Sequence, residues 1–275
     1  MQKVLVTGAN GMLGQDLCPI LEDNGYIVTE TDIDTLDLTK GNDVENFVKD
    51  LKPDIVIHCA AYTAVDKAEE ESDRAELINV KGTENIAKIS GELDIPIIYI
   101  STDYVFDGTK PTPYEPDDIT NPQTVYGKTK LLGENAVKSY CKKYYIARTS
   151  WLYGHYGKNF VETMISLAEK GDEIKVVDDQ IGCPTWTVEL SNGILKLFSK
   201  PYGIYHVCGS GATSWYGFAK EILSQAGIDG VKLSPCTTEE FPRPAKRPKY
   251  SVMDNQKICR NWKAALHDYL QLRNF

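Results

Sequence analysis

Three glycines at three-residue intervals follow a short apolar segment near the N-terminus, and this motif constrains the fold more than any other part of the sequence. Residues 3–7 predict a strand and residues 15–22 the start of a helix. The loop between them reads Gly8-Ala9-Asn10-Gly11-Met12-Leu13-Gly14. Glycine is favoured where the backbone turns with positive φ or approaches a diphosphate without a Cβ in between. The spacing alone also fits a tight turn without a ligand, but a strand before it and a helix after it predict an anion at the helix N-terminus.

Strand-like and helix-like segments alternate over the first 150 residues. Apolar runs that predict strands occupy residues 27–29, 55–57, 95–100 and 144–147, and apolar residues at helical spacing occupy 43–51 and 73–90. Such alternation predicts an α/β fold, a Rossmann-type doubly wound parallel sheet with right-handed crossovers.

The alternation becomes less regular after residue 150, which predicts a second, smaller domain. Helices are expected near 160–170, 187–198 and 215–226, a proline-containing turn at 182–184 and a strand at 203–207. We expect residues 1–150 to form an NAD(P)-binding Rossmann domain, to which part of 182–207 returns. Residues 151–275 are expected to form mainly a substrate-binding domain over the carboxyl edge of the sheet.

An acidic residue about 20 positions beyond the glycine motif is the expected partner of the adenosine ribose in a dinucleotide site. Asp32, at the end of the second predicted strand, is preferred over Glu30 and Asp34. No arginine lies near Asp32 to neutralise a 2′-phosphate, so NADH is favoured over NADPH. The residues expected to bind the cofactor are Gly8, Asn10, Gly11, Met12, Leu13, Gly14, Asp32, Asp37, Leu38, Ala60, Ala61, Thr63, Tyr126 and Lys130.

Tyr126 and Lys130 stand four residues apart at the start of a predicted helix, so they share one helix face. An ammonium group beside a phenol favours the phenolate, so we expect the pKa of Tyr126 to lie below its usual value of about 10. Such a phenol can exchange a proton with a carbinol oxygen while a hydride moves to or from the carbon. An isolated Tyr-x-x-x-Lys would fit an exposed helix pair, but here the preceding strand ends in Ser101-Thr102. Hydroxyls there point into the crevice where open α/β sheets bind ligands.

The charge balance excludes some classes of function. Acidic residues outnumber basic ones by 39 to 30, a formal net charge of −9 that argues against a general nucleic-acid binder. No segment approaches the run of about 20 apolar residues that a membrane span needs. A cytoplasmic protein is expected. The seven cysteines include no Cys-x-x-Cys pair and the four histidines no ligand spacing, so reduced thiols and no metal site are predicted.

The glycine motif, Thr102 and Tyr126-x-x-x-Lys130, in this order and spacing, resemble the extended short-chain dehydrogenase/reductase superfamily. Further motifs are Ala60-Ala61-Tyr62-Thr63-Ala64-Val65-Asp66-Lys67-Ala68-Glu69, Ser101-Thr102-Asp103-Tyr104-Val105-Phe106-Asp107-Gly108, Arg148-Thr149-Ser150-Trp151, Asp179-Gln180-Ile181-Gly182-Cys183-Pro184-Thr185, Arg247-Pro248 and Ser251. Together they resemble the dTDP-4-dehydrorhamnose reductase family over nearly the whole chain.

The resemblance implies reduction of the C4 ketone of dTDP-4-dehydro-L-rhamnose by NADH or NADPH. Tyr126 would protonate the forming alkoxide, Lys130 would tune Tyr126 and hold the nicotinamide ribose, and Thr102 would polarise the ketone. The nucleotide-sugar substrate is expected to contact Thr102, Asp103, Tyr104, Tyr126, Trp151 and Arg247. Some relatives bind magnesium at a dimer interface, but Asp16 and Glu189 do not reproduce that pattern, so no metal is predicted. The resemblance is compatible with a homodimer.

Two alternative functions remain open from the sequence. A nucleotide-sugar 4-epimerase would use the same tyrosine and lysine. A relative of this family is the regulatory subunit of methionine adenosyltransferase, which binds a dinucleotide without being chiefly a reductase. A dehydratase is disfavoured, because Tyr104 stands where those enzymes have a glutamate that pairs with the acid at Asp103.

A local basic segment departs from the acidic total. Residues 243–249, Arg-Pro-Ala-Lys-Arg-Pro-Lys, place four cations in seven positions, and the prolines stiffen the chain. A solvated basic loop is one interpretation. The other is that Arg247 and its neighbours face the diphosphate of the nucleotide sugar, because guanidinium groups match phosphate oxygens.

Overall fold

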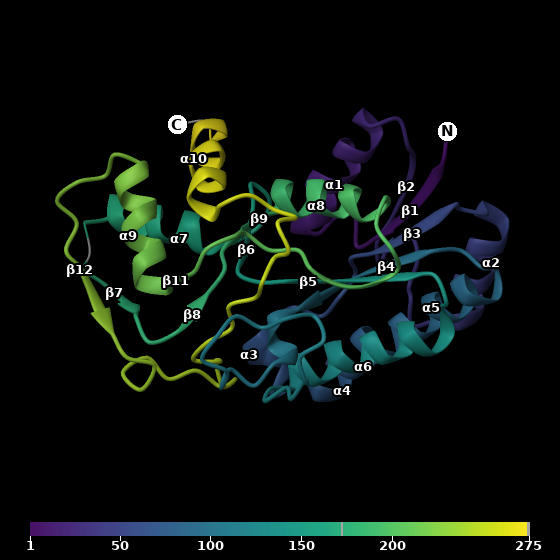
Figure 1. Cartoon of the computed structure of the whole chain (residues 1–275), viewed down its shortest axis with the longest axis horizontal. Coiled ribbons are helices and arrows are strands. Elements are labelled where there is room, and N and C mark those ends of the chain that lie inside the picture. The colour runs from purple at the N-terminus through teal and green to yellow at the C-terminus, as the bar shows by residue number, and fades with distance from the viewer. Residues whose placement is uncertain (172, 274–275) are drawn as a thin grey trace.

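Six parallel strands form the central sheet, in the order β10-β5-β4-β3-β1-β2 (Figure 1). They are β1 (Lys3–Thr7), β2 (Ile27–Thr31), β3 (Ile55–His58), β4 (Ile97–Thr102), β5 (Tyr144–Thr149) and β10 (Gly203–His206). The predicted α/β fold with a parallel sheet is therefore confirmed. The chain changes direction across the sheet between β1 and β3, and open α/β sheets bind ligands at such a switch point.

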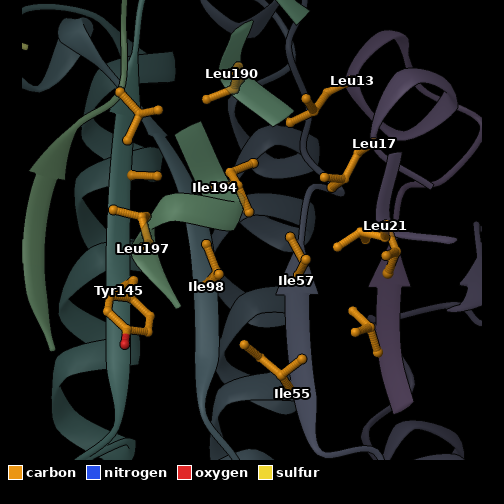
Figure 2. Close-up of a cluster of buried hydrophobic side chains, with 14 of the residues drawn as sticks. Leu13, Leu17, Leu21, Ile55, Ile57, Ile98, Tyr145, Leu190, Ile194 and Leu197 are labelled. Atoms are coloured by element: carbon orange, nitrogen blue, oxygen red, sulfur yellow. The ribbon is translucent and has the colours of Figure 1, made fainter. Parts of the chain in front are cut away.

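Helices cover both faces of this sheet (Figure 1). α1 (Met12–Asp23) and α8 (Thr187–Leu197) lie on one face, and α2 (Gly41–Leu51), α5 (Thr83–Glu92) and α6 (Val125–Tyr140) on the other. Leu13, Leu17 and Leu21 recur every fourth residue and so form one apolar stripe of α1. Figure 2 shows this stripe and the corresponding residues of α8 above the sheet side chains, where burial of apolar surface stabilises the layer.

The computed structural model describes residues 1–171 and 173–273. Residues 172, 274 and 275, which fall in the predicted C-terminal domain, lie outside the described residues. In the remainder, no helix is long and apolar enough to span a membrane.

The predicted helix 73–90 is interrupted. The structure has α4 (Ser72–Glu76), a π-helical turn over Leu77–Gly82 and then α5. The π turn contains the buried Asn79, whose side chain bonds the backbone of Tyr62 at 2.7 and 3.2 Å and the Thr129 hydroxyl at 3.0 Å. These contacts tie the turn to α6, and such long-range bonds are not visible in local periodicity.

The C-terminal part is built from small elements around a second apolar cluster, seen on the left of Figure 1. Its helices are α7 (Phe160–Glu169), α9 (Trp215–Gln225) and α10 (Trp262–Leu272), of which α10 was not predicted. Three strand pairs accompany them: β6 (Leu152–Tyr153) with β9 (Thr185–Trp186), β7 (Ile174–Val177) with β12 (Leu233–Cys236), and β8 (Ile181–Gly182) with β11 (Thr213–Ser214). The short helix α3 (Val65–Ala68) follows β3.

Candidate active site

A cavity of about 800 Å³ opens at the carboxyl ends of the sheet strands. β1, β2, β4 and β5 contribute their last residues, Thr7, Thr31, Thr102 and Thr149, and Cys59 follows β3. The cavity is lined by every residue expected to bind the cofactor, and by Thr102, Asp103, Tyr104 and Trp151 of the expected substrate site. Arg247 does not line it.

The glycine loop allows the backbone segments at the switch point to approach closely. Gly8 has φ +72°, and a Cβ on it would lie 2.6 Å from the Ala60 backbone nitrogen, so a larger residue would force the loops after β1 and β3 apart. A Cβ on Gly14 would lie 2.5 Å from Ala9. No side chain of the described residues caps the N-terminus of α1 at Gly11. The first N–H groups of α1 therefore suit a diphosphate, as the glycine spacing predicts.

Asp32 lies at the end of the cavity beside the glycine loop. Its carboxylate accepts hydrogen bonds from the backbone N–H groups of Asn10 at 3.0 Å and Ile33 at 2.8 Å. Asp37 lines the same cavity, and hydrogen bonds from Thr39 lower the pKa of its carboxyl group. The two carboxylates can accept hydrogen bonds from ribose hydroxyl groups and would repel a phosphate group on the ribose.

Thr102 ends β4 and begins a 3-10 turn over Asp103–Val105. Its hydroxyl accepts the Tyr104 N–H at 3.2 Å and donates to Asp103 Oδ1 at 3.1 Å. Asp103 Oδ2 is buried without a hydrogen-bond partner among the described residues, and burial raises the pKa of this carboxyl group to about 6. A buried carboxylate with one oxygen left without a hydrogen bond is a destabilising feature that a bound ligand can relieve.

The expected lowering of the pKa of Tyr126 is wrong. Burial raises the pKa of the phenol to about 12, although an interaction with the Thr102 side chain acts in the opposite direction. Lys130 instead donates to the Ile100 carbonyl oxygen at 2.7 Å and lies 4.0 Å from the centroid of the Tyr99 ring. Burial lowers the pKa of Lys130 to about 7. Desolvation favours the neutral form of both groups and outweighs their position on one helix face.

A buried ion pair lies beneath these residues. Both carboxylate oxygens of Glu134 accept hydrogen bonds from Arg148 at 2.8 Å, and the Ser101 hydroxyl donates to Glu134 at 2.6 Å. The Glu134 and Arg148 side chains are 0% and 2% exposed. The bonds connect α6 to β4 beside Thr102 and to β5 beside Thr149, so they set the distance between the elements that carry the site.

Trp151 lies where the chain leaves the sheet for the C-terminal elements. It has φ +48°, an unusual conformation for a bulky residue. Its indole ring stacks on Trp215 with 3.6 Å between the ring centroids. Gly182 also lies against the indole, so close that a Cβ on this glycine would be 2.4 Å from the ring. Packing on two sides therefore holds Trp151 in the strained conformation at the cavity wall.

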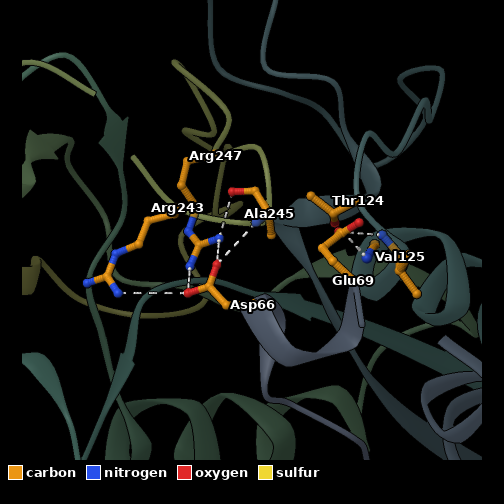
Figure 3. Close-up of polar contacts among 8 residues, drawn as sticks. Asp66, Glu69, Thr124, Val125, Arg243, Ala245 and Arg247 are labelled. Atoms are coloured by element: carbon orange, nitrogen blue, oxygen red, sulfur yellow. Dashed lines mark hydrogen bonds and ion pairs between the residues drawn. The ribbon is translucent and has the colours of Figure 1, made fainter. Parts of the chain in front are cut away.

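Arg247 lies beside the cavity rather than in it. Its guanidinium group binds the Asp66 carboxylate through two bonds of 2.8 and 2.9 Å (Figure 3). With Lys246 it lines a small hollow that shares Tyr104 with the main cavity. The structure thus brings together all of the predicted site residues except Arg247, which neighbours them through Tyr104.

Several cavity residues were not among the predicted contacts. They are Thr7, Thr31, Ile33, Leu36, Thr39, Cys59, Val65, Ile78, Ile100, Ser101, Thr149, Ser150, Leu152 and Lys158. Applying the strand-end rule to every strand would have found most of them. Lys158 follows Gly157 in a loop close to Met12, and no local pattern points to it. Over residues 1–171 and 173–273, no group of three metal-ligating side chains is present.

This chain matches the family described as RmlD substrate binding domain over residues 1–273. It is 45% identical to the spore coat polysaccharide biosynthesis protein SpsK of Bacillus subtilis (strain 168), covering 100% of this chain and 99% of that protein.

Two solved structures share its fold closely. A dTDP-4-dehydrorhamnose reductase from Clostridium acetobutylicum ATCC 824 has 51% identity and a TM-score of 0.95, covering 98% of this chain and 99% of that chain. A dTDP-4-dehydrorhamnose reductase from Bacillus anthracis str. Ames, in complex with NADP, has 43% identity and a TM-score of 0.95 at the same coverage.

Proposed function

This chain belongs to the RmlD family, and from that membership we propose that it reduces the C4 ketone of dTDP-4-dehydro-L-rhamnose to dTDP-L-rhamnose with a nicotinamide dinucleotide. The observation that carries the proposal is one cavity lined by the glycine loop, Thr102, Tyr126 and Lys130. When bound, the reduced nicotinamide supplies the hydride. The uncapped N-terminus of α1 and the close backbone approach at Gly8 and Ala60 fit the diphosphate of such a cofactor.

Tyr126 is the proposed proton donor. Because its pKa is about 12, the phenol is protonated at neutral pH and can transfer its proton to the alkoxide oxygen that forms at C4. The Thr102 hydroxyl would donate to the ketone oxygen before the transfer. Lys130 would hold the ribose hydroxyls of the cofactor, and its charged form would stabilise the phenolate left behind.

The substrate is proposed to lie between Tyr104 and Trp151. Trp151 lines the cavity, and an aromatic ring suits the C–H side of a deoxysugar, while one face of the indole is covered by Trp215. Asp103 would accept a hydrogen bond from a hydroxyl group of the sugar. Arg247 would face the diphosphate, although in this structure it pairs with Asp66.

We propose NADH as the preferred cofactor because Asp32 and Asp37 both line the adenosine end of the cavity. In the described part of the chain the lysines that line the cavity are Lys130 and Lys158, and no arginine lines it. A 2′-phosphate on the ribose would add a further negative charge there. The ratio of kcat/KM for NADH and NADPH tests this directly, and a preference for NADPH contradicts it. An Asp32→Ala variant is expected to shift the ratio toward NADPH.

Cytoplasmic location and a homodimer also remain proposals. The cysteines of the described residues are all free thiols, which agrees with a reducing compartment. Size-exclusion chromatography with light scattering tests the oligomeric state, and a monomer at micromolar concentration contradicts the dimer.

The activity is tested by mixing the protein with dTDP-4-dehydro-L-rhamnose and NADH or NADPH and following the absorbance of the reduced nicotinamide. We expect stoichiometric oxidation of the cofactor and formation of dTDP-L-rhamnose, identified by NMR. A 4-epimerase would convert a hydroxylated nucleotide sugar without net oxidation of added cofactor. A regulatory subunit would bind the dinucleotide without turnover. Absence of oxidation with both cofactors would overturn the proposed function.

A further inference from the structure

Lys158 is a cation in the cavity that the proposed chemistry does not use. The charged side chains that line the cavity are three carboxylates and two ammonium groups, those of Asp32, Asp37, Asp103, Lys130 and Lys158. Lys130 is buried and is already assigned to the nicotinamide ribose. Lys158 is exposed, and within residues 1–171 and 173–273 its side chain makes no hydrogen bond or ion pair. Its ammonium group is therefore available to an anionic part of a ligand.

The loop that carries Lys158 lies over the first turn of α1. This 154–158 loop follows β6 and leads into α7. A Cβ on Gly154 would lie 3.2 Å from the Met12 Cγ atom, and a Cβ on Gly157 would lie 3.8 Å from Met12 Cε. Met12 is the first residue of α1 and, like Lys158, lines the cavity. Because a lysine ammonium is carried on a flexible four-carbon stem, the Lys158 charge can reach the space in front of the α1 N-terminus.

The 154–158 loop is held at both ends by one buried side chain. Asn159, which is 8% exposed, donates to the Gly154 carbonyl oxygen at 2.7 Å. The same side chain accepts the Glu162 N–H at 3.0 Å and so caps α7. The backbone on either side of Lys158 is thereby fixed next to α1, while the exposed Lys158 side chain can adjust to a ligand.

The N-terminus of α1 needs a further positive charge to balance a diphosphate. Its first turn, Met-Leu-Gly-Gln, is uncharged, so α1 offers N–H groups and the positive end of the helix dipole. The dipole is equivalent to about half a charge, whereas each phosphate of a dinucleotide diphosphate carries a negative charge. The carboxylates of the cavity outnumber its ammonium groups, so they do not supply the balance. Lys158 is the lining cation close to this helix end.

We infer that Lys158 binds the diphosphate of the nicotinamide dinucleotide, which then lies between this ammonium group and the N–H groups at the start of α1. The inference rests on the proposed function for the identity of the cofactor. It makes the C-terminal part of the chain contribute a charge to the cofactor site. A 2′-phosphate on the adenosine ribose would be a different partner for the same charge, and the test separates the two.

The test measures the binding of ADP-ribose, which contains the diphosphate but no nicotinamide, to the full chain by titration calorimetry. Lys158→Ala should weaken binding about 3- to 10-fold, because it removes a charge-assisted hydrogen bond at an exposed site. Lys158→Arg should restore the affinity to within about 2-fold. The loss should be the same for 2′-phospho-ADP-ribose, which has the same diphosphate. Lys220→Ala, at an exposed lysine of α9 outside the cavity lining, controls for the change in net charge.

A second measurement uses salt. Raising the salt concentration should weaken ADP-ribose binding to the unaltered chain more than to Lys158→Ala, since screening acts on the charge that the variant lacks. An equal salt dependence of the two proteins contradicts a direct contact between Lys158 and the diphosphate.

Equal affinities of Lys158→Ala and Lys220→Ala for ADP-ribose would overturn the inference. A loss confined to 2′-phospho-ADP-ribose would also overturn it, because Lys158 would then face the 2′-phosphate. Both outcomes leave the proposed function standing, since reduction of the ketone is measured separately. If ADP-ribose does not bind the unaltered chain, the proposed cofactor site and the inference fail together.

Discussion

The pKa values of Tyr126 and Lys130 move in opposite directions for one reason. Burial penalises the charged form of each group, so the pKa of the phenol rises to about 12 and that of the amine falls to about 7. At neutral pH the phenol holds its proton, as a donor to an alkoxide must. The protonated phenol of Tyr126 therefore suits a reduction, in which it donates a proton, better than the abstraction of a proton from an alcohol.

The role of Tyr126 predicts a specific loss. The Tyr126 ring makes an edge-to-face contact with Tyr104, with 5.6 Å between the ring centroids. Tyr126→Phe keeps this ring but removes the hydroxyl group that would donate the proton. We expect kcat to fall about 100-fold or more, with cofactor affinity largely retained. Steady-state kinetics and fluorescence titration with NADH measure the two quantities. Near-normal turnover would remove Tyr126 from the mechanism.

Replacing Asp103 is expected to stabilise the protein by an amount that depends on pH. Burial raises its pKa from 3.8 to about 6, so the unfolded chain ionises first and stability is lost as the pH rises from about 3.8 to 6. The ionised carboxyl then costs about 3 kcal/mol at pH 8 and less than 1 kcal/mol at pH 4. Asp103→Asn should therefore raise the free energy of unfolding at pH 8 far more than at pH 4. Urea unfolding at both pH values checks this, and an equal effect at the two would contradict it.

Among the elements, α6 carries the two residues proposed to act in proton transfer, and a third residue on the same face fixes the helix to the sheet. Tyr126, Lys130 and Glu134 follow at four-residue intervals, and the first two line the cavity. Glu134 bonds Ser101 of β4 and Arg148 of β5. The helix is thereby held to the two strands whose ends complete the site.

Breaking this connection should destabilise the protein strongly. Glu134→Ala leaves the Arg148 charge buried and unpaired, and we expect a loss of about 3–5 kcal/mol in the free energy of unfolding. The double variant Glu134→Leu, Arg148→Met removes both charges and should recover part of the loss. Denaturant unfolding of the three proteins measures this. A double variant less stable than Glu134→Ala would argue against an electrostatic cause.

The start of α6 is also set by close packing. A Cβ on Gly127 would lie 2.2 Å from the Tyr104 carbonyl oxygen. Gly127→Ala must therefore separate α6 from the turn that carries Asp103 and Tyr104, and a shift of about 1 Å can lower kcat about 100-fold. Lys128→Ala, on the exposed side of the same helix, is the matched control and should retain full activity. Equal kcat values for the two variants would show that the close contact is unimportant.

At the scale of the whole molecule, the cavity joins two apolar clusters. Leu152 packs against the sheet cluster and Trp151 against the C-terminal cluster, and both line the cavity. A ligand that fills the cavity therefore contacts both parts of the chain. It should stabilise them together.

This arrangement predicts one cooperative thermal transition that ligands shift as a whole. At 100 times its Kd, the cofactor should add about 2.7 kcal/mol, which raises Tm by about 5 °C. Differential scanning calorimetry with and without NADH and dTDP measures the shift. Two transitions, of which only one moves, would contradict the joint stabilisation.

The sequence by itself determined the fold class and predicted most of the residues that line the cavity. Strand and helix periods are local properties, and so are the positive φ at Gly8 and the close approach of Gly14 to Ala9. Because parallel strands end at one edge, Thr102 and Ala60 could be assigned to one crevice before their contacts were known. The helix spacing of Tyr126 and Lys130 likewise predicted their common face.

Only the tertiary structure decided the energetics of these residues. The pKa of Tyr126 depends on how much water surrounds the phenol, which spacing along a helix does not specify. Glu134 pairs with Arg148, 14 residues away, and Arg247 pairs with Asp66, 181 residues away. The sequence did not show that a carboxylate, instead of solvent, would face Arg247. Short-range patterns establish which elements form, whereas burial and ion pairing depend on contacts between segments far apart in the chain.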